Sequence, residues 1–273
     1  MSGLVHVIRL HLVADFGEDI HKFRGQRAAP LALEDLRAVP HALEDLRAGR
    51  LRVLHERSFL DDPTRLLRLS RYSVRLRFAA EQRTAELAEQ ALRAGALETL
   101  SGARIGAELR LALAEPDPLA VFCALAQLGV LGALHPRLRL QVPLVRRALD
   151  LLAPDAGARV DVLLLSALTL PLALRAEGEQ GVEIRALLDR LEFPGAERDR
   201  VLATTAAVPR LLEELPRRTR PSELHALASG LPPEAVALAG ALDAQVQVAA
   251  ERWLHVVRHV HLQISGEIGR AHV

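Results

Sequence analysis

Arginine side chains gather between residues 50 and 78, where eight arginines face only three acidic residues. Three of the eight, Arg65, Arg68 and Arg71, are spaced by three, so on a helix they form one slowly drifting stripe. Guanidinium groups near the partial positive charge of a helix start suit a triphosphate or an RNA backbone. The charge pattern equally fits the solvated face of a surface helix, so two interpretations stay open.

An acid precedes this stripe, because Asp62 lies one helical turn before Arg65. A carboxylate only accepts hydrogen bonds and a guanidinium only donates them, so the pair offers an acceptor beside a donor. Cytosine and adenine each present an amino donor beside a ring-nitrogen acceptor, whereas guanine and uracil present a carbonyl beside an N–H. Asp62 and Arg65 could therefore select C and A without a nucleic-acid template. The alternative is that Asp62 only caps the helix and pairs with Arg65.

The segment that carries these residues, Leu46 to Phe78, reads LRAGRLRVLHERSFLDDPTRLLRLSRYSVRLRF. It resembles the neck of bacterial-type tRNA nucleotidyltransferases (CCA-adding enzymes) and poly(A) polymerases, in which an acid-acid-x-x-Arg motif is followed by further arginines. The resemblance implies that Asp62 and Arg65 are the protein template for the incoming base. It also implies that Arg68 and Arg71 contact the nucleotide.

Supporting positions of the same family can be matched as well. Asp61 stands at the first motif position, where the family more usually has glutamate. A second family motif is similar to Ser101 to Leu109, SGARIGAEL, in which Arg104 and Glu108 match residues that buttress the template helix. Ala103 replaces a commoner glutamate there, a departure that would weaken the buttress. The resemblance is strong from about residue 42 to 138 and loose from there to residue 266.

The reaction that the resemblance implies is template-independent addition of C, C and A to the 3′ end of tRNA. The intact family enzyme uses CTP and ATP with magnesium, and its catalytic head carries a Gly-Gly loop and an Asp-x-Asp pair for two metal ions. Neither motif occurs in these 273 residues. We therefore expect a truncated enzyme that holds no metal or cofactor and does not polymerise nucleotides alone.

The expected partners are CTP, ATP and the acceptor arm of tRNA, with Arg75, Arg146 and Arg147 as candidate RNA contacts. A solvated surface is the alternative for each of these arginines. Two other interpretations of the whole chain stay open: a fragment of a poly(A) polymerase, and a non-catalytic helical RNA-binding or scaffold protein. The sequence does not decide between CCA, CC-only, A-only or poly(A) addition, nor does it fix the oligomeric state.

Composition predicts the fold class that must position these residues. Half of the residues are apolar but only 3% are aromatic, and the chain is rich in Ala, Leu, Arg and Glu, which favour helices. We expect an all-α fold with four parts: an irregular and conceivably misassembled remnant over 1–48, a neck over 49–140, a helical body and tail over 141–265, and an artefactual tail over 266–273. The heptapeptide ALEDLRA occurs twice, at 32–38 and 42–48.

Capping residues, glycines and prolines predict where helices begin and end. Pro136, Pro143, Pro154 and Pro171 are expected to separate short antiparallel helices. The predicted helices span 62–78, 81–95, 102–113, 118–129, 159–170, 182–191, 196–215, 221–227 and 233–254.

The remaining candidates for chemistry are weak. Cys123 is single and is predicted to be a small core residue. His255 and His259 could face one side of a helix with His261 nearby, but no partner carboxylate accompanies them, so we expect no metal site. Neither a signal peptide nor a membrane-spanning run is recognisable, and the expected location is the cytoplasm.

Overall fold

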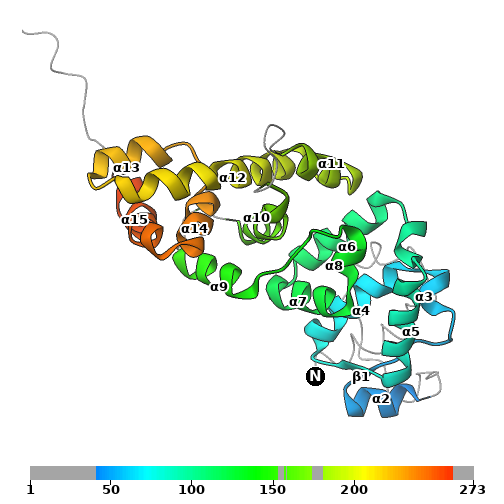
Figure 1. Cartoon of the computed structure of the whole chain (residues 1–273). Coiled ribbons are helices and arrows are strands. Elements are labelled where there is room, and N and C mark those ends of the chain that lie inside the picture. The colour runs from blue at the N-terminus through cyan, green and yellow to red at the C-terminus, as the bar shows by residue number, and fades with distance from the viewer. Residues whose placement is uncertain (1–40, 153–156, 158, 174–180, 261–273) are drawn as a thin grey trace, which may run out of the picture. The chain divides into compact units, whose positions relative to one another are not determined.

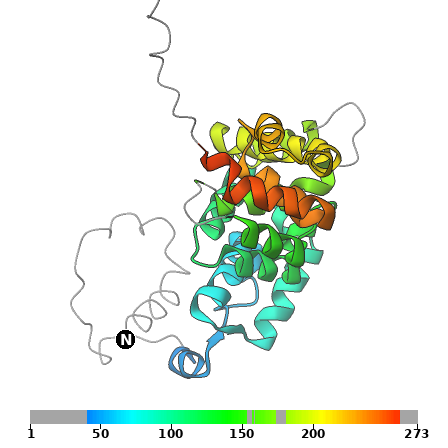
Figure 2. The same ribbon diagram turned by 90° about the vertical axis from the view of Figure 1, so that its left-hand side faces the viewer.

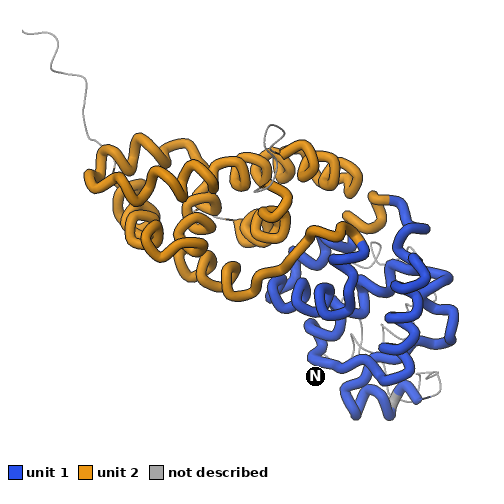
Figure 3. Tube along the Cα trace, in the orientation of Figure 1, with its two compact units in different colours: residues 1–101, 108–133 blue, residues 102–107, 134–273 orange. Residues whose placement is uncertain are grey.

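Helices make up almost all the regular structure of the computed structural model, which describes residues 41–152, 157, 159–173 and 181–260. Within this part, the only strands are β1 (Arg50–Leu51) and β2 (Ala79–Ala80), which pair in parallel. The all-α prediction is therefore confirmed. The chain divides into two compact units: residues up to Ser101 with Glu108–Ala133, and Gly102–Ala107 with the residues from Leu134 onward (Figure 3).

The helices follow in chain order and are labelled in Figure 1. The first seven are α2 (Ala42–Ala48), α3 (Ser58–Asp61), α4 (Thr64–Leu76), α5 (Gln82–Arg93), α6 (Gly102–Leu113), α7 (Pro118–Leu128) and α8 (Val130–Leu134). The others are α9 (Val142–Leu151), α10 (Val160–Ala173), α11 (Val182–Arg190), α12 (Gly195–Glu214), α13 (Pro221–Ala228), α14 (Pro233–Leu242) and α15 (Ala244–His255). Short 3₁₀ turns follow α5, α12 and α15, at Ala96–Thr99, Leu215–Arg217 and Val257–His259.

The core of the first unit lies where α4 packs on α7. Leu66 of α4 and Phe122 and Leu125 of α7 are completely buried, and Phe59 of α3 is nearly so. Each such side chain contributes about 1.5–3 kcal/mol by leaving water. Because apolar residues recur on one side of α4, its opposite side is left for the arginine stripe.

Helix α14 is the centre of the second unit, since α9, α10, α12 and α15 all pack against it (Figures 1 and 2). Its residues Ala235–Ala239 are completely buried, and the alanines among them let neighbouring helices approach closely. At its start the buried carboxylate of Glu234 accepts hydrogen bonds from the backbone N–H of Arg159 (2.7 Å) and from Nη2 of Arg200 (2.9 Å). A buried charge with two such donors is compensated for its loss of water.

Most predicted helix boundaries agree with the structure to within one to three residues. The helix expected to reach Phe78 ends at Leu76, because Arg77 adopts the left-handed conformation, with φ 56°. The helix expected over 233–254 was wrong as a single element: it breaks at Asp243. The Asp243 carboxylate caps α15 by accepting from the backbone N–H of Gln245 (2.7 Å). No glycine or proline marks this break in the sequence.

The expectation that Pro171 separates two helices was also wrong, because Pro171 lies inside α10. It stands two residues before the last helical position, so its missing N–H and its ring disturb only the last turn of the helix. Both of its neighbours in the chain, Leu170 and Leu172, are buried, and this burial offsets the lost hydrogen bond. Pro154, in contrast, lies outside the described residues.

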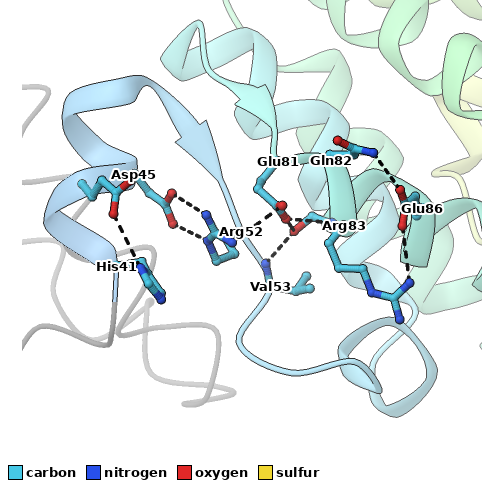
Figure 4. Close-up of polar contacts among 10 residues, drawn as sticks. His41, Asp45, Arg52, Val53, Glu81, Gln82, Arg83 and Glu86 are labelled. Carbon is cyan, nitrogen blue, oxygen red and sulfur yellow. Dashed lines mark hydrogen bonds and ion pairs between the residues drawn. The ribbon is translucent and has the colours of Figure 1, made fainter.

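The second copy of the repeated heptapeptide is helix α2, so the structure differs here from the irregular segment predicted over 1–48. Gly49 ends α2 in the left-handed conformation, with φ 63°. The buried carboxylate of Asp45 then receives two hydrogen bonds from Arg52, Nε at 2.7 Å and Nη2 at 3.0 Å (Figure 4). The first copy, at 32–38, and the predicted tail over 266–273 lie outside the described residues.

Glu81 is the N-cap residue of helix α5, and its side chain also contacts the segment that follows β1. Its carboxylate caps the helix by accepting from the backbone N–H (3.0 Å) and the hydroxyl (3.2 Å) of Thr84, and it lies 3.7 Å from Arg52 (Figure 4). The Thr84 hydroxyl accepts in turn from the backbone N–H of Val53 (3.1 Å). The pKa of Glu81 is held below its ordinary value, first by a backbone hydrogen bond from Arg83 and then by the bonds from Thr84 and the charge of Arg52, against the opposing effect of burial.

We expect Arg52→Ala to lower the free energy of unfolding by about 2 kcal/mol, because it removes the cation that compensates the buried Asp45 carboxylate. Denaturant unfolding of the purified chain measures this. Arg83→Gln is the matched control, since its pair with Glu56 is half exposed at both ends. Equal losses in the two variants would contradict the role assigned to Arg52.

A second prediction concerns pH. Because the folded-state pKa of Glu81 is lowered, its stabilisation is present above the ordinary carboxyl pKa and is lost as pH falls through the lowered one. The unfolding free energies of the unaltered chain and Glu81→Gln should therefore differ at about pH 7 and converge towards about pH 3. Glu89→Gln, on the exposed side of α5, controls for the loss of one negative charge. A difference that stays constant over this range would exclude the cap.

Candidate functional site

The predicted base-reading pair lies at the junction of α3 and α4. Asp62 has an extended backbone (φ −142°, ψ 92°) and is followed by Pro63, with α4 starting at Thr64. One carboxylate oxygen, Oδ1, accepts from the hydroxyl (2.7 Å) and the backbone N–H (3.2 Å) of Thr64. Asp62 thus does cap the start of the helix, through Oδ1.

The second oxygen of Asp62 faces Arg65, with Oδ2 3.9 Å from Nε. Nη1 of Arg65 lies 3.4 Å from the backbone carbonyl of Ser58, which holds the guanidinium over the end of α3. Both side chains are partly exposed, 24% for Asp62 and 18% for Arg65. An acceptor and a donor therefore stand side by side at the surface of the unit, which is the arrangement that the base-reading prediction requires.

Asp61 is flanked by basic groups. Its two carboxylate oxygens lie 3.4 Å from Nε of Arg57 and 3.9 Å from Nδ1 of His55. All three side chains are about half exposed or more. Contacts of this kind between exposed groups contribute little stability, so Asp61 mainly sets the local charge beside Asp62.

Three arginines of α4 meet two acids contributed by α6 and the turn after it. We call these five residues, Arg68, Arg71, Arg75, Glu108 and Glu115, the charge ladder. Glu108 bonds Nε of Arg68 (2.7 Å) and Nη1 of Arg71 (3.1 Å). Glu115 lies 3.6 Å from Nε of Arg71 and 3.6 Å from Nη1 of Arg75. Each acid is thus shared by two arginines, and Arg71 touches both.

Burial differs along the charge ladder. The side chains of Glu108, Glu115 and Arg71 are almost fully buried, whereas that of Arg68 is 37% exposed and that of Arg75 is about half exposed. Burial alone would lower the pKa of Arg68, but the charge of Glu108 and its hydrogen bond outweigh burial and raise this pKa above its ordinary value. The Arg68 guanidinium is therefore firmly protonated.

Sequence reasoning found Glu108 but missed Glu115. The spacing could have identified Glu115, because it follows Glu108 by seven residues, about two helical turns, and so lies on the same side. Arg104, the other predicted support, is exposed on α6. The structure brings Asp62 and Arg65 together and joins Arg68, Arg71 and Glu108.

The candidate RNA contacts in α9 are both exposed. Arg147 also has a structural partner, since its Nε donates to the backbone carbonyl of Ala241 near the end of α14 (3.0 Å). Cations are favourable at helix ends, where carbonyls lack partners. Arg146 is the more available of the two for a phosphate.

Cys123, which was predicted to be a core residue, is only partly buried. His259 accepts a hydrogen bond through Nε2 from Nε of Arg258 (3.1 Å), and His261 lies outside the described residues. Over residues 41–152, 157, 159–173 and 181–260, no group of three His, Cys, Asp or Glu side chains lies close enough together to hold a metal ion. In that same part of the chain no helix is both long and apolar enough to cross a membrane.

Curated relatives share recognisable sequence with the chain. An A-adding tRNA nucleotidyltransferase of Geobacter sulfurreducens is 31% identical over 199 residues, 67% of this chain and 22% of that protein. Its counterpart in Halalkalibacterium halodurans is 46% identical over 88 residues, 32% of this chain and 21% of that protein. A multifunctional CCA protein of Laribacter hongkongensis is 30% identical over 264 residues, 82% of this chain and 64% of that protein. The chain thus spans less than two thirds of these relatives.

Solved structures agree with the sequence matches. A CCA-adding enzyme in complex with ATP superposes with a TM-score of 0.66 at 27% identity, covering 83% of this chain and 55% of the other. A Thermotoga maritima CCA-adding enzyme complexed with tRNA superposes with a TM-score of 0.65 at 26% identity, covering 82% and 55%. No family model matches the chain.

Fold and sequence together define the class as nucleotidyltransferases, represented here by helical elements. Within that class, the chain belongs to the tRNA nucleotidyltransferase family. The resemblance stated from the residues alone is therefore confirmed at the level of the family.

We expect Glu108→Gln to lower the free energy of unfolding by about 2–3 kcal/mol, because the buried Arg71 would lose a charged hydrogen-bond partner. Thermal and denaturant unfolding of the purified chain measure this effect. Glu86→Gln on α5 is the control, since Glu86 makes only exposed contacts with Gln82 and Arg83. If the two variants unfold alike, Glu108 does not hold α4.

Proposed function

We propose that this chain is the nucleotide-selecting and tRNA-facing helical part of a tRNA nucleotidyltransferase, acting in maturation of the tRNA 3′ end. The observation that carries this proposal is the Asp62 and Arg65 pair, an acceptor beside a donor at the start of an arginine-rich helix. Support comes from relatives named as A-adding and CCA-adding enzymes and from neighbours solved with ATP, CTP and tRNA.

In the proposed mechanism, Oδ2 of Asp62 accepts a hydrogen bond from the base amino group, and the guanidinium of Arg65 donates to the ring nitrogen. Guanine and uracil would set acceptor against acceptor and donor against donor, so they bind less well. Oδ1 of Asp62 stays bonded to Thr64, which fixes the carboxylate before the base arrives.

The arginine stripe supplies charge for the rest of the ligand. Arg68 and Arg71 are the candidates for steadying the phosphates or sugar, and Arg75 and Arg146 are candidates for the acceptor arm of tRNA. Magnesium is expected in the intact family enzyme together with CTP and ATP, but no donor set for it is found among the described residues. We therefore assign this chain's residues to selection and RNA contact and derive no transfer step from them.

Relatives named as A-adding and as multifunctional CCA proteins both match, so the chain fits enzymes that add A alone as well as enzymes that add all three nucleotides. A helical RNA-binding protein without nucleotide selectivity is the competing function. It predicts equal affinity for the four nucleoside triphosphates.

We expect the chain to bind CTP and ATP in preference to GTP and UTP, and Asp62→Ala to lower this preference about tenfold, the effect of one hydrogen bond of about 1.4 kcal/mol. Calorimetric titration with each of the four triphosphates measures both quantities. Asp61→Ala is the matched control, because it removes the neighbouring acid but leaves the pair intact. An equal loss of affinity for all four nucleotides in Asp62→Ala would mean that Asp62 only caps α4.

A further inference from the structure

The two arginines that the family resemblance assigns to the nucleotide, Arg68 and Arg71, stand in different environments. The Arg71 guanidinium is enclosed: Nη1 bonds Glu108, Nε lies 3.6 Å from Glu115, and Nη2 donates to the hydroxyl of Tyr72 (3.3 Å). Its side chain is only 9% exposed. To reach a phosphate, Arg71 would have to leave two buried carboxylates, at a cost larger than one new ion pair returns.

Arg68 has a different geometry. Its Nε is anchored to Glu108, and Glu108 is the partner that the structure records for it. The guanidinium is a rigid planar fork, so a bond through Nε fixes its plane. Nη2 then lies on the same side as Nε, as in the pair of Arg52 with Asp45, and Nη1 faces away from the carboxylate. Since this side chain is also more exposed than that of Arg71, Arg68 is the member of the two that can take a phosphate without losing its support.

Glu115 maintains the difference between the enclosed Arg71 and the more exposed Arg68. Its carboxylate lies against both Arg71 and Arg75 and is almost fully buried itself. If its charge were removed, Arg71 would keep Glu108 as its only anionic partner in the charge ladder. Arg71 would then compete with Arg68 for the two oxygens of Glu108.

We infer that Glu115 is a positioning residue that holds Arg71 in the interior of the unit. Glu108 is then left to orient Arg68. Of the two arginines, Arg68 is the one that contacts the phosphates of the incoming nucleotide. This inference rests on the proposed function and sharpens it. It assigns Arg71 a supporting role in place of the nucleotide contact that the resemblance implies. Glu115 itself belongs to neither of the family motifs matched in this sequence.

The test compares binding of CTP with binding of cytidine, which has the same base and sugar but no phosphates. Calorimetric titration and thermal unfolding are measured on the full chain and on Arg68→Gln, Arg71→Gln and Glu115→Gln. Arg93→Gln and Glu89→Gln are matched controls, because these residues form an exposed pair on α5 of the same unit.

Arg68→Gln should weaken CTP binding about tenfold, leave cytidine binding unchanged, and melt close to Arg93→Gln. Glu115→Gln should weaken CTP binding about threefold with cytidine unchanged, and should melt several degrees below Glu89→Gln. A purely structural Glu115 would lower the fraction of folded chain and so affect both ligands alike. The ratio of CTP to cytidine affinity therefore separates positioning from stability.

Two results would overturn the inference: a Glu115→Gln variant whose CTP-to-cytidine ratio is unchanged, or an Arg71→Gln variant that loses CTP binding while melting like its control. If the unaltered chain binds neither ligand, the proposed function fails, and the phosphate contact of Arg68 fails with it. The contact between Arg71 and Glu115 has a separate test. If the decreases in melting temperature of Arg71→Gln and Glu115→Gln are additive in the double variant, the two residues do not interact, and the enclosure of Arg71 by Glu115 is excluded.

Discussion

A carboxylate that is removed from water must be met by a cation, and this constraint fixes where the arginines of this chain can go. Among the residues that the structure describes, the side chains of four acids are almost fully buried, and each is compensated by arginine: Asp45, Glu108, Glu115 and Glu234. Two of them, Glu108 and Glu115, hold the same helix, α4. Glu108 and Glu115, which contact the arginines of the charge ladder, therefore set the orientation of these side chains.

The choice of arginine follows from the same constraint. A guanidinium offers five donors in a plane, so one arginine can serve two acids, as Arg71 does, or bond both oxygens of one acid, as Arg52 does with Asp45. Lysine offers one compact charge with three donors and lacks the planar pair of donors that binds both oxygens of one carboxylate. Arginine, which far outnumbers lysine in this chain, is thus put to structural use at several places.

Much of the fold was predictable because its helices are punctuated by residues with local effects. Asp117 with Pro118 starts α7 and Gly129 ends it, and these signals depend only on neighbouring residues. The sequence did not predict the helix break at Asp243, because an aspartate within an alanine-rich run fits both a helix interior and a helix cap. Which of the two it becomes depends on how α14 and α15 pack on each other.

The contact between Asp62 and Arg65 was predictable from their spacing of three residues, although Asp62 itself is extended and precedes α4. Spacing could not show that Arg68 and Arg71 differ, because burial depends on a second helix that lies some forty residues further along the chain.

The balance of charge around α4 links these observations to selectivity. Four arginines of α4, at positions 65, 68, 71 and 75, lie against the carboxylates of Asp62, Glu108 and Glu115, so acids of the same unit compensate much of their charge. Under the proposed function, attraction to phosphate is common to every nucleoside triphosphate, so it adds to affinity and does not distinguish one nucleotide from another. The hydrogen bonds of Asp62 and Arg65 to the base do differ between nucleotides, and selectivity therefore depends on them.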